Sequence, residues 1–140
     1  AITEGTGQAW SCNAAAGMAG VVAFGAGRME QVARDFAARY PAARLVLIAD
    51  AGKEDHCARI ARDIECAWVE MPAGSPPNFD ANDLHQRDGL DALAELLRNP
   101  KAPPQRFRLM TADELAALPP VRWRATACAA APPTRSITPT

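Results

Sequence analysis

The sequence predicts an α/β domain built on a mostly parallel central sheet of about four strands, with helices on both faces. The first observation is that short β-branched runs alternate along the chain with segments of helical periodicity. The second is that residues 45–49 are continuously apolar, which is typical of a strand buried on both faces. Hydrophobic residues make up 49% of the chain and charged residues 22%, as in ordinary globular domains.

The first half of the chain supplies two expected strands and two expected helices. A short apolar start ends at Glu4 and forms the first strand, and residues 8–16 form an Ala-rich helix. Residues 20–24 are β-branched and apolar between glycines, which indicates a second strand. From residue 29 to residue 40 apolar side chains recur at helical spacing, and Pro41 ends that pattern.

The second half repeats the alternation. Residues 45–49 form the third strand, and a helix over 54–65 follows with acids in its first turn, where the helix dipole favours them. Residues 67–71 form the fourth strand. The prolines of residues 72–77 make a loop that cannot pair in a sheet and that delivers residues 78–83. A last helix covers residues 90–97.

The chain changes character after residue 98, so we predict one domain over residues 1–98 and a linker and tail over 99–140. Prolines mark the linker, and residues 111–114 have a capping-box pattern ahead of a short helix. The tail from residue 125 has no hydrophobic period and is expected to be disordered.

Charge and composition narrow the function classes. The net charge of −1 argues against a domain that grips nucleic acid through bulk electrostatics. No apolar run approaches the roughly 20 residues of a membrane span and no signal peptide opens the chain, so we expect a cytoplasmic protein. The four cysteines form no Cys-x-x-Cys pair, which favours free thiols over a zinc site; they are Cys12, Cys57, Cys66 and Cys128.

Acidic residues follow the strands of this expected sheet. Glu4 ends the first strand, Asp50 ends the third, and Asp80 to Asp83 follow the fourth. Because the carboxyl ends of parallel strands share one edge, these carboxylates are expected to converge and hold a divalent metal, as in phosphoryl transfer. The alternative is that each acid caps a loop or a helix, and spacing alone leaves both interpretations open.

The order of these motifs resembles the Toprim domain of DNA primases, in particular the primase-helicases of phages and plasmids. Glu4-Gly5, then Ile48-Ala49-Asp50 before a helix, then the run from Phe79 to Leu84 carry the resemblance. It extends from residue 2 to about residue 97. Residues 111–124 also resemble the entry to a RecA-like helicase module, although no Gly-rich phosphate loop follows them.

The resemblance implies separate roles for the acids. Glu4 corresponds to the general acid or base, and Asp50 to the first aspartate of a metal-binding Asp-x-Asp. The second aspartate of that motif falls on Gly52, which is a departure from the family pattern. Asp80 and Asp83 correspond to a downstream acidic element that supports a second metal or orients the site, with Asp83 expected to bind metal beside Asp50 and Asp80 to assist. Glu54 or Asp55 would be near enough in sequence to reach back in place of the missing aspartate.

These matches imply metal-dependent nucleotidyl transfer with Mg²⁺ or Mn²⁺, making primers on single-stranded DNA beside a helicase module of the parent protein. Lys53 and His85 are candidate nucleic-acid contacts, and Trp10 is a candidate for base stacking. Two alternatives remain open. One is a catalytically degenerate Toprim module that binds DNA or docks a partner, and the other is a Toprim-type nuclease.

Overall fold

The structure is a computed structural model that describes residues 1–103 and 111–117. The chain divides into two compact units, Ala1–Arg106 and Phe107–Thr140. In the second unit the described part is the short helix α6, Ala112–Ala116, which follows the capping-box pattern at residues 111–114. The tail from residue 125 lies outside the described residues, as does most of the predicted linker.

Residues 1–103 of the first unit contain four parallel strands and five helices, which confirms the predicted α/β class. In chain order they are β1 (Ile2–Thr3), α1 (Thr6–Ala16), β2 (Val21–Val22), α2 (Ala26–Arg39), β3 (Val46–Ile48), α3 (Glu54–Ile64), β4 (Ala67–Val69), α4 (Ala81–Asp88) and α5 (Leu90–Arg98). The strand order in the sheet is β2-β1-β3-β4. Every neighbouring pair is parallel.

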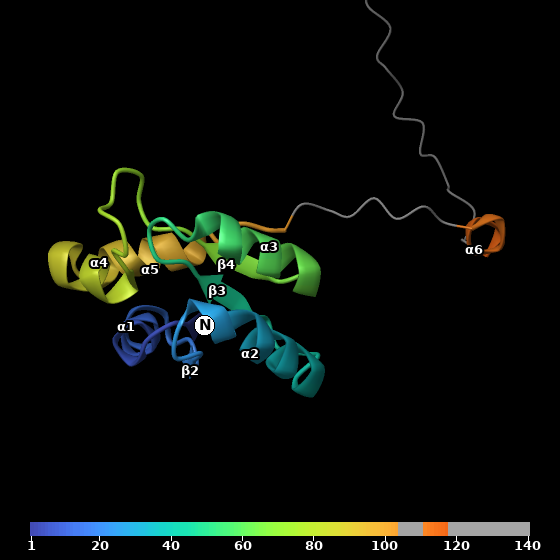
Figure 1. Cartoon of the computed structure of the whole chain (residues 1–140), viewed down its shortest axis with the longest axis horizontal. Helices are drawn as coiled ribbons and strands as arrows, with labels where there is room; N and C mark the ends of the chain where they lie inside the picture. The colour runs from blue at the N-terminus through green and yellow to red at the C-terminus, as the bar shows by residue number, and fades with distance from the viewer. Residues whose placement is uncertain (104–110, 118–140) are drawn as a thin grey trace, which may run out of the picture. The chain divides into compact units, whose positions relative to one another are not determined.

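Alternation along β3 divides the hydrophobic core between the two faces of the sheet. Leu47 and Ala49 belong to a cluster that includes residues of α2 and α3. Val46 and Ile48 belong to a second cluster with residues of α1, α4 and α5. Figure 1 shows the same arrangement, with α1, α4 and α5 grouped apart from α2 and α3. Both faces of the sheet are therefore covered, as the continuous apolar run predicted.

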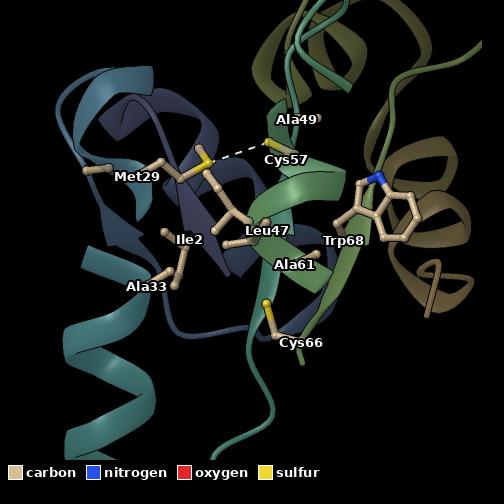
Figure 2. Close-up of a cluster of buried hydrophobic side chains, with 11 residues drawn as sticks. Ile2, Met29, Ala33, Leu47, Ala49, Cys57, Ala61, Cys66 and Trp68 are labelled. Carbon is tan, nitrogen blue, oxygen red and sulfur yellow. Dashed lines mark hydrogen bonds between the residues drawn. The ribbon is translucent and has the colours of Figure 1, made fainter. Parts of the chain in front are cut away.

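The core on the α2 and α3 face is shown in Figure 2, where Ile2 and Leu47 of the sheet meet Met29 of α2 and Cys57 of α3. The Cys57 thiol donates a hydrogen bond to the Met29 sulfur at 3.5 Å. Three cysteines are buried free thiols, as predicted, namely Cys12, Cys57 and Cys66. The fourth, Cys128, lies outside the described residues.

One edge of the sheet is covered by the segment that follows α5. Lys101 pairs with Trp68 of β4 as an antiparallel bridge, with backbone hydrogen bonds of 2.8 and 3.0 Å. The Lys101 ammonium also lies 5.6 Å from the centre of the indole ring. Pairing the outer side of β4 in this way removes a run of open backbone groups on which another strand could add.

The structure corrects one element of the sequence analysis. Residues 78–83 were expected to be carried by a loop, but the last three of them form the first turn of α4 (Ala81–Asp88). The helix begins there because Asp80 and Asp83 cap its amino terminus. Within residues 1–103 and 111–117, no helix is both long enough and apolar enough to cross a membrane.

The topology places a switch point between β1 and β3. From β1 the chain crosses through α1 to β2 on one side, and from β3 it crosses through α3 to β4 on the other. The helices of these two crossovers lie on opposite faces of the sheet. The loops after β1 and β3 therefore separate, and in open α/β sheets ligands bind outside the strand carboxyl ends at such a point.

Candidate functional site

Glu4 and Asp50 meet at this switch point through a shared lysine. Glu4 follows β1 directly, Asp50 comes two residues after the end of β3, and Lys53 is the residue before α3. The Lys53 ammonium lies 3.0 Å from Glu4 Oε2 and 2.9 Å from Asp50 Oδ2. The carboxylate side chains are 13% and 8% exposed, and that of Lys53 is 29% exposed. The two predicted acids thus share one cation, and that cation belongs to the chain.

The two carboxylates also stabilise the charged form of Lys53. Burial alone would lower the pKa of its ammonium, but the hydrogen bonds to Asp50 and Glu4 outweigh that effect and raise the pKa above its ordinary value. Lys53 was predicted to contact DNA. The structure directs its ammonium to the two carboxylates, and contact with a phosphate would require it to leave at least one of them, so the DNA contact stays a prediction.

Gln8 is a site residue that the sequence analysis missed. It lies in α1, is 4% exposed, and donates from Nε2 to Asp50 Oδ1 at 2.8 Å and to Asp80 Oδ2 at 3.0 Å. Within the described residues its Oε1 atom is buried and accepts no hydrogen bond. A buried amide oxygen without a donor is costly, and it is also a suitable ligand for a water molecule or a cation. The sequence signal that could have identified Gln8 is its position, four residues after Glu4, as a polar residue in the first helix.

Asp80 is brought to the site by the backbone. The amide of Ala51 donates to the Phe79 carbonyl, and the amide of Asn78 donates to the Ala51 carbonyl, each at 2.9 Å. These bonds tie the segment before α4 to the loop after β3. Asp80 therefore lies beside Asp50, and the Gln8 amide bridges the two carboxylates.

The other contacts of Asp80 and Asp83 form a capping box. Asp80 Oδ1 accepts from the backbone amides of Asn82 and Asp83 at 2.7 and 2.9 Å, and Asp83 Oδ2 accepts from the amide of Asp80 at 3.1 Å. These bonds satisfy amides that the first turn of a helix leaves without partners. Both acids thus cap α4, which is the alternative that spacing alone left open.

His85 lies where α4 packs against α1. Its Nδ1 atom is 3.1 Å from the hydroxyl of Ser11, which also donates to Asn82 Oδ1 at 3.2 Å. A Cβ atom added to Gly7 would lie 3.4 Å from the Asn82 side chain, so the two helices approach closely there. These polar contacts fix α4 on α1. The prediction that His85 touches nucleic acid remains a prediction.

The loop after β3 differs from the expected Asp-x-Asp in its backbone as well as its sequence. Gly52 has φ of +90°, a conformation that residues with a Cβ rarely adopt. Its amide donates to Glu54 Oε1 at 2.8 Å, and this bond, more than any other influence, lowers the pKa of Glu54. Glu54 therefore reaches back to the loop, as considered from the sequence, but its contact there is the Gly52 amide. Asp55 is exposed.

The donor set of the site fits a divalent cation in part. Mg²⁺ takes oxygen ligands, and Glu4 and Asp50 already hold one cationic group between them. Glu4 and Asp50 are the residues that would hold such an ion, and Lys53 would have to give up its ion pairs with them. In the part of the chain that the structure describes, no three His, Cys, Asp or Glu side chains are grouped as ligands of one ion.

The comparisons with known proteins gave no match. No family model matches the chain, and no curated protein and no solved structure was found to be similar to it.

Proposed function

We propose that residues 1–98 form a Toprim-type domain that carries out metal-dependent nucleotidyl transfer, making primers on single-stranded DNA. The observation that carries the proposal is the pair of carboxylates that follow neighbouring parallel strands, Glu4 and Asp50, which hold the Lys53 ammonium between them at the switch point of the sheet. Acids in this position, together with the order of motifs along the sequence, support a phosphoryl-transfer site.

Each residue of the site has a distinct part in this proposal. Asp50 and Glu4 are the residues that would hold the metal ion, and Glu4 would exchange a proton with the attacking hydroxyl group. Gln8 keeps Asp50 in place through its hydrogen bond of 2.8 Å. A bound Mg²⁺ or Mn²⁺ would supply charge neutralisation at the transferred phosphate. The ammonium of Lys53, which lies against both carboxylates, would contact a phosphate oxygen or the DNA backbone.

Asp80 and Asp83 take positioning roles, in place of direct ligation. The Oδ1 atom of Asp80 accepts from two backbone amides of α4, and the Oδ2 atom of Asp83 accepts from the backbone amide of Asp80. Asp80 Oδ2 faces the amide of Gln8. In this proposal Asp80, held by the capping box with Asp83, sets the orientation of the Gln8 amide and through it that of Asp50.

The proposal is tested by primer synthesis. The full chain is incubated with a single-stranded template, labelled nucleoside triphosphates and Mg²⁺ or Mn²⁺, and products are resolved on a denaturing gel. We expect short labelled products from the wild type, and their loss in Glu4→Gln and Asp50→Asn. Each of these variants keeps the size of the side chain and removes the charge that the metal needs.

A matched control separates loss of charge from loss of fold. Asp35 is exposed on α2, where it accepts a hydrogen bond from Gln31. The variant Asp35→Asn makes the same chemical change as Asp50→Asn outside the site, so it should retain product formation. Absence of products from the wild type with either metal contradicts the proposed activity.

The second candidate is a Toprim module that binds DNA or docks a partner without catalysis. The ion pairs of Lys53 favour it, because the ammonium neutralises the acids that a metal would use. Gly52 in place of an acid favours it as well. Binding of a fluorescent single strand without product formation would select this candidate. Nicking of supercoiled plasmid by the same preparation would select the nuclease alternative.

The partners in this proposal are single-stranded DNA, nucleotides and a helicase module of the parent protein, and the place of action is the cytoplasm. DNA binding by a chain of net charge −1 would be local and assisted by the metal. Its dependence on salt should accordingly be shallow, because few phosphates are neutralised by lysine or arginine.

A further inference from the structure

The position of Lys53 determines which ligands the site can accept. Its ammonium lies 3.0 Å from Glu4 and 2.9 Å from Asp50, so it holds the position between the carboxylates that a divalent ion would need. We propose that Lys53 is a resident cation that excludes bare divalent ions and yields the carboxylates only to a metal that arrives bound to a polyphosphate. This inference rests on the proposed function and names the form in which that site takes its metal.

The argument begins with charge. Two carboxylates and one ammonium leave little attraction for a free divalent ion, because the ion would have to approach the ammonium as closely as it approaches its ligands. Desolvation strengthens this repulsion, since the Glu4 and Asp50 side chains are only 13% and 8% exposed. The bare ion therefore binds weakly while Lys53 remains in place.

A metal–polyphosphate complex changes this balance. It brings its own anionic oxygens, to which the ammonium can transfer when the metal takes the carboxylates. Lys53 is suited to such a transfer, because its side chain is 29% exposed and ends in a flexible stem with three donors. Every charged group would then keep an opposite partner before and after the exchange.

Gln8 provides a second, independent observation that a ligand belongs here. Its side chain is almost completely buried, its Nε2 contacts Asp50, and no described residue donates to its Oε1. Both Asp50 and Asp80 are acceptors, so reversing the amide would place its oxygen against two carboxylates. The free oxygen is thus a fixed feature of the site, and a cation or its bound water would satisfy it.

The inference is tested with Mn²⁺ as the probe, on the full chain. Binding of Mn²⁺ is followed by electron paramagnetic resonance for the wild type, Lys53→Met, Lys53→Arg and Lys101→Met. Lys53→Met removes the charge at nearly constant length, Lys53→Arg keeps it, and Lys101→Met makes the same change at the Glu70 ion pair on the edge of β4. We expect Lys53→Met to bind Mn²⁺ at least tenfold more tightly than the other three proteins.

A thermal measurement guards against a variant that folds poorly. Lys53→Met leaves two carboxylates without their ammonium, and Mn²⁺ should replace it. Its unfolding temperature should therefore rise by about 5–10 °C at Mn²⁺ concentrations that leave the wild type unchanged. If Lys53→Met shows no such rise, or if it binds Mn²⁺ no more tightly than the wild type, the inference is overturned.

The wild type itself supplies the remaining test. Amide resonances of Gly5 and Gly52, which follow Glu4 and Asp50 in sequence, are recorded with Mn²⁺ alone, inorganic tripolyphosphate alone, and the equimolar complex. We expect paramagnetic broadening with the complex at concentrations where Mn²⁺ alone has no effect. Equal broadening by Mn²⁺ alone, or no broadening by the complex, overturns the inference. Tight binding of the complex without primer synthesis would instead contradict the proposed activity and leave this inference standing.

Discussion

Replacement of Asp80 tests how the acidic segment after β4 acts. In the structure this carboxylate accepts two backbone amides of α4 through Oδ1 and the Gln8 amide through Oδ2. The variant Asp80→Ala removes all three acceptors. Loss of an N-cap costs about 1 kcal/mol, and loss of the bond from Gln8 to a carboxylate adds about 1–2 kcal/mol.

The free energy of unfolding should therefore fall by about 2–3 kcal/mol in Asp80→Ala. Asp83→Ala removes one acceptor and one favourable charge from the first turn, so it should cost only about 0.5–1 kcal/mol. Asp80→Asn keeps a good cap but sets its amide against that of Gln8, and its cost should lie between these values. The matched control is Asp91→Ala in the first turn of α5, which is exposed and should change stability by a few tenths, about 0.3 kcal/mol.

The assay is urea unfolding of the full chain, followed by circular dichroism at neutral pH. The order of destabilisation, with Asp80→Ala first and Asp91→Ala last, is the informative result. A cost below about 0.5 kcal/mol for Asp80→Ala, which is the lower limit for a lost N-cap, would refute the reasoning. A larger cost for Asp83→Ala than for Asp80→Ala would refute it as well.

Three further predictions concern the backbone and the core. Gly52→Ala should lower the free energy of unfolding by about 1 kcal/mol because φ of Gly52 is +90°. Gly5→Ala, in extended backbone with open space around it, should lower it by only about 0.3 kcal/mol. Chemical denaturation measures both. Gly20→Ala would place a Cβ atom 2.8 Å from that of Ala9, so α1 must shift and stability should fall by about 1–3 kcal/mol. Burial raises the pKa of Cys57 to about 12. Alkylation of Cys57 at pH 8, followed by mass spectrometry, should therefore be at least about 100-fold slower in the folded protein than in urea. The free energy of unfolding should also decline as the pH rises above about 9, where the thiol of the unfolded chain ionises.

The sheet could be predicted from the sequence because its signals are local. The apolar run around β3 and the helical periodicity of α2 and α3 each lie within one segment of sequence. In the structure these apolar residues are buried on the two faces of the sheet, as the patterns predict. The structure differs at α4, since Asp80 to Asp83 fits both a metal motif and a capping box. When one sequence pattern fits both a metal site and a helix cap, the neighbouring side chains and backbone decide which of the two forms.

The candidate site was only partly predictable for a related reason. Glu4 and Asp50 follow strands, so parallel topology brings them to one edge. The contacts of Gln8 and Lys53 depend on side-chain direction across 42 and 49 residues of sequence, which no periodic pattern encodes. In the sequence nothing distinguishes Lys53 from an ordinary surface lysine. Its pairing with the two acids is seen only in the structure.

Calorimetric titration of the full chain with the Mg²⁺ complex of a non-hydrolysable nucleoside triphosphate tests the central claim most directly. The claim is that Glu4 and Asp50 form one cation site that serves phosphate chemistry. The account predicts saturable binding by the wild type, retained in Asp35→Asn and lost in both Glu4→Gln and Asp50→Asn. Absence of saturable binding by the wild type, or binding that persists unchanged in both site variants, would contradict it.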